Sequence, residues 1–163
     1  MMEILTSYYF SPLGSLQIQC TSEHILSILF TDNPATSQSE DNECIRNCKL
    51  QLNEYFSGTR KLFDLSLDQQ GTDFQLKVWD LLYKIPYGRT ISYNDLAKQY
   101  GDVKAIRAVA AANGKNKLAI IVPCHRVIGS NQSLTGYAGG LWRKKWLLNH
   151  EARYHSGLQQ FNF

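Results

Sequence analysis

The sequence predicts an α+β fold in which a small antiparallel-sheet domain precedes a mainly helical domain. Short β-forming runs separated by turn residues concentrate before residue 70, and apolar residues at helical spacing dominate after residue 71. The polar stretch 68–71 (Asp-Gln-Gln-Gly) separates the two patterns. We therefore expect an N-terminal domain at residues 1–70 and a C-terminal domain at residues 71–163.

The N-terminal part is typical of a β-meander. Residues 4–10, 16–20 and 25–30 are rich in β-formers, and the turn Ser-Pro-Leu-Gly at 11–14 joins the first two runs. Residues 31–43 are polar and contain Asn-Pro, which predicts an exposed loop.

Apolar residues at helical spacing from Ile45 to Phe56 predict one helix, which Gly58 ends. Phe63, Leu65 and Leu67 then alternate with polar residues and predict a further strand.

The C-terminal part begins with a helix that Thr72 and Gln75 cap and that carries an apolar stripe from Phe74 to Ile85. Ser92 can cap a short second helix that ends at Gly101, and Asp102 can cap a third helix over residues 103–113. Two short helices joined by a glycine-containing turn predict a helix-turn-helix.

The third helix has an unusual outer face. At helical spacing, one side should face the core and consists of Val103, Ile106, Val109, Ala110 and Asn113. The opposite side carries small residues flanked by lysines, with Arg107 at its edge: Lys104, Ala108, Ala111, Ala112 and Lys115. High helix propensity or packing against another helix would explain the alanines. Alternatively, a thin helix enters a nucleic-acid groove, with the lysines on phosphates.

The segment around Cys124 is the candidate reactive site. The β-branched run 119–122 predicts a buried strand that delivers Pro123-Cys124-His125-Arg126-Val127. A cysteine nucleophile reacts as its thiolate, so the site should lower a thiol pKa that is normally about 8.5. His125 and Arg126 supply positive or proton-accepting groups beside it, although a buried structural cysteine would show the same pattern.

Composition limits the function classes. The net charge is +3, and lysine and arginine dominate residues 77–145, which permits nucleic-acid binding. No apolar run reaches the roughly 20 residues of a membrane span, and the N-terminus lacks a secretory signal pattern, so we expect a cytoplasmic protein, or a nuclear one in a eukaryote. The thiol pair Cys44 and Cys48, like the pair Cys20 and His24, lacks further ligands at metal-binding spacing, and we expect structural thiols and no metal.

The reactive segment resembles the active-site signature of the O6-alkylguanine-DNA alkyltransferases, the methylated-DNA–protein-cysteine methyltransferases. The similarity extends over residues 74–151, including FQLKVWDLLYKIPYGRTISYNDLA, AIRAVAAANGKN, IIVPCHRVIG and GYAGGLWRKKWLLNHE. The N-terminal part is similar mainly through its Ser-Pro-Leu-Gly turn, and the bacterial constitutive type is the nearest in pattern. The resemblance implies a ribonuclease H-like N-terminal domain and repair of DNA by alkyl transfer.

The resemblance also implies roles for individual residues. Cys124 would accept the alkyl group. His125 would remove the thiol proton through a water, and Glu151 would orient the imidazole. Tyr93 would donate to N3 of the leaving guanine. The guanine pocket would use Tyr137, Ala138, the carbonyls of Cys124 and Val127, and Asn116, which would tie the helix to the active-site loop.

The third helix acquires a role by the same resemblance. Arg107 would enter the duplex and fill the gap left by a flipped nucleotide, and the alanine face would contact the minor groove. Double-stranded DNA would be the partner of a protein acting as a monomer without a cofactor, on O6-alkylguanine and on O4-alkylthymine. Lys117 stands where the family usually has proline, and Ala138 where it often has serine.

Three other classes were weighed against this one. Alkyltransferase-like proteins that only bind lesions carry tryptophan in place of the cysteine, so Cys124 argues against them. A major-groove regulator needs long polar side chains on its recognition helix, where this chain has alanines. A thiol hydrolase needs an oxyanion hole that the sequence does not reveal.

Overall fold

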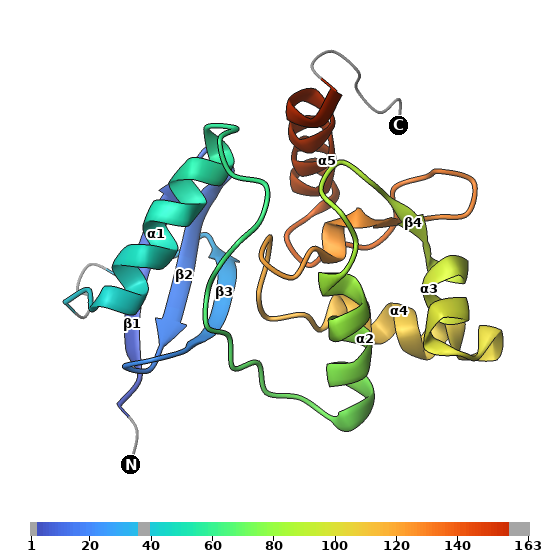
Figure 1. Cartoon of the computed structure of the whole chain (residues 1–163), viewed down its shortest axis with the longest axis horizontal. Coiled ribbons are helices and arrows are strands. Elements are labelled where there is room, and N and C mark those ends of the chain that lie inside the picture. The colour runs from blue at the N-terminus through green and yellow to red at the C-terminus, as the bar shows by residue number, and fades with distance from the viewer. Residues whose placement is uncertain (1–2, 36–39, 157–163) are drawn as a thin grey trace. The chain divides into compact units, whose positions relative to one another are not determined.

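The computed structural model describes residues 3–35 and 40–156. The chain divides into two compact units, Met1–Gln70 with Lys117–Ala119, and Gly71–Asn116 with Ile120–Phe163. The division predicted from the sequence is contiguous, whereas here three residues of the second half, Lys117–Ala119, belong to the first unit. An antiparallel three-stranded sheet with one helix, followed by a mainly helical unit, confirms the predicted α+β class (Figure 1).

The first unit is an antiparallel meander covered by one helix. Its strands are β1 (Leu5–Ser11), β2 (Gly14–Cys20) and β3 (Ile25–Thr31), paired in the order β1-β2-β3. Helix α1 (Glu43–Phe56) covers one face of this sheet (Figure 1), and its inner side chains are buried: Ile45, Cys48, Leu52 and Tyr55. These three strands and this helix match the sequence predictions.

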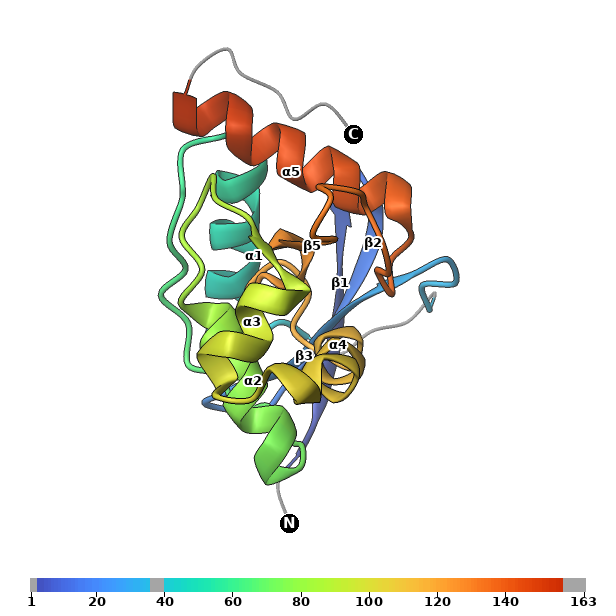
Figure 2. The ribbon, with the colours of Figure 1, turned by 90° about the vertical axis from the view of Figure 1, so that its right-hand side faces the viewer.

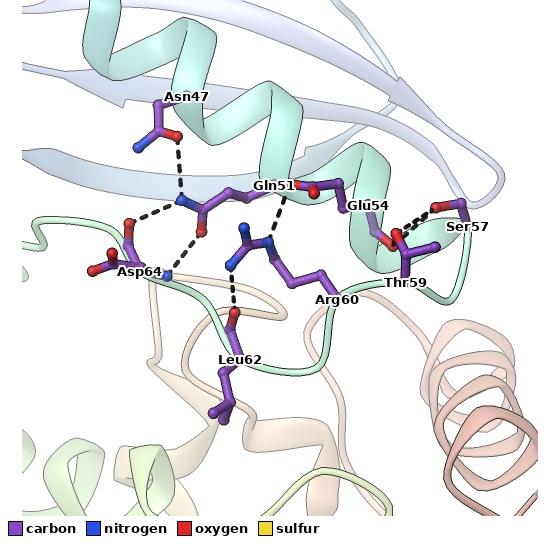
Figure 3. Close-up of polar contacts among 8 residues, drawn as sticks. All are labelled: Asn47, Gln51, Glu54, Ser57, Thr59, Arg60, Leu62 and Asp64. Carbon is purple, nitrogen blue, oxygen red and sulfur yellow. Dashed lines mark hydrogen bonds and ion pairs between the residues drawn. The ribbon is translucent and has the colours of Figure 1, made fainter.

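The strand predicted at residues 63–67 is wrong in its extent. Only Leu67 forms a β-bridge, parallel to Ile25 of β3. At Asp64, the backbone N–H donates to Gln51 Oε1 at 2.8 Å and the carbonyl accepts from Gln51 Nε2 at 2.9 Å (Figure 3). Because a side chain on α1 occupies the peptide groups that a strand would pair, this segment runs extended beside α1 without joining the ladder.

Residues 117–119 also lie on the free edge of β3. The N–H of Ile28 donates to the Lys117 carbonyl at 2.8 Å, and the N–H of Ala119 donates to the Ile28 carbonyl at 2.9 Å. This single bridge ends at once, since residues 119–121 form a turn in which Ile120 has φ +73°. The predicted strand at 119–122 is therefore wrong, although all four residues are buried. The Val122 carbonyl instead accepts from Asn116 Nδ2 and from the Cys124 N–H, each at 2.8 Å.

The second unit is helical around a two-residue parallel pairing. Its helices are α2 (Asp73–Tyr83), α3 (Tyr93–Tyr100), α4 (Ile106–Gly114) and α5 (Leu141–Ser156). Strands β4 (Ile91–Ser92) and β5 (Val127–Ile128) pair in parallel. None of the described helices has the length and apolar character required to cross a membrane.

Helices α3 and α4 form the predicted helix-turn-helix (Figure 2). Ser92 caps α3 through the Asp95 N–H, and Gly101 ends it in the left-handed region at φ +110°, which a side chain would strain. Asp102 accepts from the Lys104 N–H as predicted, but residues Val103–Ala105 form a 3-10 turn before α4 begins.

The 3-10 turn changes which residues face the core. Val103, predicted to be internal, is 48% exposed. Ala112, predicted on the outer face, is only 3% exposed, and its carbonyl accepts from Trp79 Nε1 of α2 at 2.8 Å. A 3-10 turn has about three residues per turn instead of 3.6, so a helical phase read from residue 103 is displaced along α4.

Candidate active site and nucleic-acid interface

Cys124 begins a 3-10 turn, Cys124–Arg126, between the buried residues 120–122 and β5. Pro123 precedes it, and the Val127 N–H donates to the Cys124 carbonyl and closes the turn. The cysteine side chain is a free thiol with 8% of the residue exposed. The turn thus holds a buried sulfur on a short, hydrogen-bonded support.

The surroundings of Cys124 raise the pKa of its thiol on balance. Burial raises its pKa, and a hydrogen bond with Asn116 and the charge of Lys144 offset that effect only in part. The expectation that the site lowers this pKa is therefore wrong, because desolvation of the thiolate outweighs the favourable groups. A proton acceptor has to engage the thiol before it can act as a nucleophile.

His125, Arg126 and Glu151 form a buried polar cluster beside that cysteine. His125 Nε2 and Glu151 Oε2 are 2.7 Å apart, and Arg126 reaches the same carboxylate through Nε at 2.7 Å and Nη2 at 3.0 Å. Arg126 Nη1 also donates to the Ile85 carbonyl at 2.6 Å. Glu151 on α5 therefore holds two consecutive side chains of the reactive turn.

The cluster fixes the charge of its members. Burial opposes ionisation of Glu151, but His125 and Arg126 outweigh it and hold the pKa of the carboxyl well below its usual range. Burial lowers the pKa of the His125 imidazole. With Nε2–H donated to the carboxylate, the neutral ring leaves Nδ1 as an acceptor, and this buried atom has no partner among the described residues. His125 is thus prepared to accept a proton at Nδ1.

Tyr93 is hydrogen-bonded to the segment that leads to Tyr137 and Ala138, two residues that the resemblance assigns to the base pocket. The Tyr93 hydroxyl donates to the Thr135 carbonyl at 3.0 Å, and burial raises its pKa. The Tyr137 hydroxyl is buried without a partner in the described part of the chain, and Ala138 is exposed. Both tyrosine hydroxyls are therefore available as hydrogen-bond donors, and that of Tyr137 has no acceptor among the described residues.

Val127 and Asn116 take structural positions around the same turn. Val127 is fully buried and pairs with Ile91 in the short parallel sheet. The buried Asn116 side chain donates to the Val122 carbonyl at 2.8 Å, two residues before the cysteine. The predicted tie between the helix-turn-helix and the reactive segment therefore has a definite hydrogen bond.

The outer face of the helix-turn-helix is exposed as predicted for all but one residue. The exposed members are Lys104, Arg107, Ala108, Ala111 and Lys115. Ala112 is buried against α2 and cannot contact a groove. Within residues 3–35 and 40–156, no carboxylate forms an ion pair with Arg107, so nothing supports a structural ion-pair role for this arginine, for example with Asp95.

Sequence reasoning missed Lys144, and it named Arg126 only as a charged group beside Cys124, without its partner Glu151. Arg126 ties the carboxylate of Glu151, and the fully buried Lys144 donates to the carbonyls of Thr135 and Gly136. Lys144 lies seven residues before Glu151, so the two share one face of α5 with the buried Leu147 and Leu148. That placement was the available signal, but lysine is so rarely buried that it predicts an exposed position.

The described residues contain no group of three or more His, Cys, Asp or Glu side chains arranged to hold a metal ion. Cys20 and Cys48 are buried and Cys44 is partly exposed, and burial raises the pKa of all three thiols.

The fold and the site together define a class of protein: a helix-turn-helix protein with a buried cysteine next to a histidine–glutamate pair. Residues 73–153 match the family model of the 6-O-methylguanine DNA methyltransferase DNA binding domain, and residues 4–69 match that of its ribonuclease-like domain. The chain belongs to the 6-O-methylguanine DNA methyltransferase family, which confirms the resemblance found in the sequence.

Relatives and solved structures agree with this assignment. The chain is 44% identical over 150 residues to the constitutive methylated-DNA–protein-cysteine methyltransferase of Bacillus subtilis, covering 86% of this chain and 91% of that protein. It is 44% identical to the enzyme of the same name from Methanosarcina acetivorans, with 86% and 94% covered. The crystal structure of Mycobacterium tuberculosis O6-methylguanine methyltransferase matches with a TM-score of 0.85 at 41% identity, covering 93% of this chain and 94% of that one.

A structure of the Mycobacterium tuberculosis protein in complex with DNA also matches this chain. Its TM-score is 0.83 at 43% identity, with 90% of this chain and 92% of that chain covered.

Proposed function

We propose that this protein repairs alkylated DNA by moving the alkyl group from O6 of guanine onto Cys124. The observation that carries the proposal is the His125–Glu151 pair at 2.7 Å next to a buried, free cysteine. The protein is a methylated-DNA–protein-cysteine methyltransferase, and its partner is double-stranded DNA. A complex of its mycobacterial relative with DNA supports this partner. The domain at residues 71–163 carries both DNA binding and the acceptor, and residues 1–70 form the other domain.

The chemistry is a single displacement at the alkyl carbon. The thiol proton passes to His125 Nδ1 through a water, while Glu151 holds the ring and stabilises the imidazolium. The sulfur lone pair forms the new S–C bond as the C–O6 bond breaks, and the bonding pair stays on the guanine. The guanine then takes up one proton, so that overall the thiol proton has moved from Cys124 to the base. Because a thioether is not readily hydrolysed, each molecule reacts once.

The pocket recognises guanine through the groups around the turn. Tyr93 donates to N3 of the base as charge develops on it, which requires its hydroxyl to leave the Thr135 carbonyl when substrate binds. Tyr137 and the backbone of Ala138 form the wall, and the second lone pair of the Cys124 carbonyl and the Val127 carbonyl accept from the guanine amino group. Thymine alkylated at O4 offers the same carbon–oxygen bond and is a second substrate.

The nucleotide reaches the cysteine by flipping out of the duplex. A stacked base cannot bring its O6 substituent to a buried sulfur, so the nucleotide has to leave the helix. The exposed Arg107 fills the vacated space, the small side chains of Ala108 and Ala111 let α4 approach the minor groove, and Lys104 and Lys115 contact phosphates. We place this reaction in the cytoplasm, with the protein acting as a monomer.

Intact-protein mass spectrometry after incubation with O6-methylguanine duplex DNA tests the proposal. The protein should gain one methyl group and no more, and Cys124→Ser should gain none while binding the duplex as before. A methylated Cys124→Ser protein, or more than one transfer per molecule, would exclude Cys124 as a single-use acceptor.

Nucleotide flipping has a separate test. Arg107→Ala should slow repair of duplex DNA much more than reaction with the free base O6-methylguanine, which needs no extrusion. Arg89→Ala, which removes another exposed arginine of the second unit, serves as the control. If Arg107→Ala slowed the reaction with both substrates equally, Arg107 would not act by filling the space that the flipped nucleotide vacates.

A further inference from the structure

Three thiols of the first unit lie around the first two turns of α1: Cys20, Cys44 and Cys48. Cys20 is the last residue of β2, and α1 begins at the end of the sheet where β2 ends (Figure 1). Asn42, the N-cap of α1, joins the two elements, because its Oδ1 accepts from the Cys20 thiol at 3.7 Å and from the Ile45 N–H at 2.8 Å. The Cys20 sulfur therefore lies against the first turn of the helix, which contains Cys44.

Cys44 is the accessible member of this group. It is partly exposed and lines a pocket of about 470 Å³ on the first unit, a size that suits a small molecule. Glu43 and Arg46, which are exposed, also line this pocket and offer partners for ammonium and carboxylate groups. Cys20 and Cys48 are fully buried, so a molecule in the pocket meets the Cys44 thiol first.

A hydrogen bond between the Cys20 and Cys44 thiols sets the order in which they react. This bond lowers the pKa of Cys44 and raises that of Cys20, whereas burial raises the pKa of both thiols and brings that of Cys20 to about 11. Cys44 is therefore the thiol of the pair that ionises first. Since a thiolate is the species that attacks a disulfide, Cys44 is the first nucleophile and Cys20 the second.

Cys48 is badly placed for either step. It follows Cys44 by one helical turn, and side chains at that spacing have Cβ atoms about 5–6 Å apart. A disulfide needs Cβ atoms at about 3.5–4.5 Å, so a bond between these two residues would distort α1. Cys48 thus serves as an internal control for the other two thiols.

We propose that Cys44 is a modification site for small disulfides such as oxidised glutathione, and that Cys20 then displaces the small thiol to form a Cys20–Cys44 disulfide. The Cys44 thiolate attacks one sulfur of the small disulfide and expels the other half as a thiolate, which takes up the proton that Cys44 lost. Cys20 attacks the Cys44 sulfur in the same way and expels the second small thiol. Overall, the protein loses two hydrogen atoms and the small disulfide becomes two thiols. The reaction uses neither Cys124 nor DNA and is independent of the proposed function.

Incubation of folded Cys124→Ser protein with oxidised glutathione tests this proposal, because the substitution leaves the three thiols of the first unit. Peptide mass spectrometry after blocking of free thiols with N-ethylmaleimide should find a Cys20–Cys44 disulfide and a blocked Cys48, and dithiothreitol should restore all three thiols. Adding Cys20→Ser should stop the reaction at Cys44 carrying one glutathione, and adding Cys44→Ser should abolish the adduct. Cys48→Ser in the same background is the matched control and should form the disulfide as its parent does.

Thiols that stay free in the folded protein and react only in urea would overturn the proposal and leave all three as structural residues. A disulfide that includes Cys48, or a Cys44→Ser protein that reacts like its parent, would also overturn it. If circular dichroism shows that a serine variant does not fold, the peptide map of its parent decides, since that map identifies the paired cysteines without a further substitution.

Discussion

Replacing Glu151 by glutamine isolates the contribution of one buried charge. The carboxylate is 1% exposed and makes three short contacts, one to His125 and two to Arg126. Glutamine keeps the volume but offers one acceptor oxygen and an NH₂ group that donates. Whichever way the amide is turned, its NH₂ meets a donor of His125 or Arg126, and the guanidinium loses its counter-charge.

The size of the effect follows from this geometry. Breaking a buried ion pair by removing one partner costs about 3–5 kcal/mol, because the other charge stays buried and uncompensated. For a chain of this size each kcal/mol lowers Tm by about 2–4 °C, so we expect a decrease of roughly 6–20 °C. Loss of the carboxylate that orients the proton acceptor His125 should also slow alkyl transfer, by up to the about 10²–10⁴-fold that a positioned general base contributes.

Thermal unfolding and single-turnover transfer to the protein from O6-methylguanine DNA measure the two effects. Glu54→Gln is the matched control, since it removes the partner of Arg60 at 3.2 Å in an ion pair whose side chains are 27% and 36% exposed (Figure 3). Such a surface pair contributes about 0–1 kcal/mol, so this variant should unfold near the unaltered protein. A Glu151→Gln protein that unfolds like Glu54→Gln and transfers at the normal rate would refute the cluster as both a structural and a catalytic unit.

Three further outcomes are expected. Folding lowers the pKa of Glu151, so the stability that its carboxylate contributes is present above the unfolded pKa of about 4.3 and is lost as pH falls toward the folded pKa. In acid titrations followed by circular dichroism, the unaltered protein should lose its stability advantage over Glu151→Gln. A difference in stability that stays constant with pH would contradict this. Ala111→Leu should weaken duplex binding in a fluorescence anisotropy titration without lowering Tm, since Ala111 is exposed on α4. Unchanged affinity would mean that this face of α4 does not enter the DNA groove. Trp79→Phe removes the bond from Nε1 to the Ala112 carbonyl and leaves a small void, so urea unfolding should show a loss of about 2 kcal/mol, and no loss would mean that this contact does not hold α4.

Local interactions made much of the fold predictable. The caps at Thr72 and Ser92 and the end of α3 at Gly101 depend on residues within a few positions, and all three occur as predicted. Asp102 also acts as a cap, but of the 3-10 turn that precedes α4. The strand predictions at 63–67 and 119–122 failed because their peptide groups bind elsewhere. Gln51, 13 residues from Asp64, occupies the first segment, and Asn116 binds the Val122 carbonyl in the second.

The sequence by itself determined the family, the helix-turn-helix and the pairing of a cysteine with an adjacent histidine. Only the tertiary structure decided that Ala112 is buried, that the Cys124 pKa is raised, and that Lys144 lies without a carboxylate partner among the described residues. The reason is that burial and electrostatics sum over groups distant along the chain: Glu151 reaches His125 across 26 residues, and Lys144 reaches Thr135 across 9. Periodicity and motif spacing describe neighbours along the chain, so they do not give the distances between such groups in the folded protein.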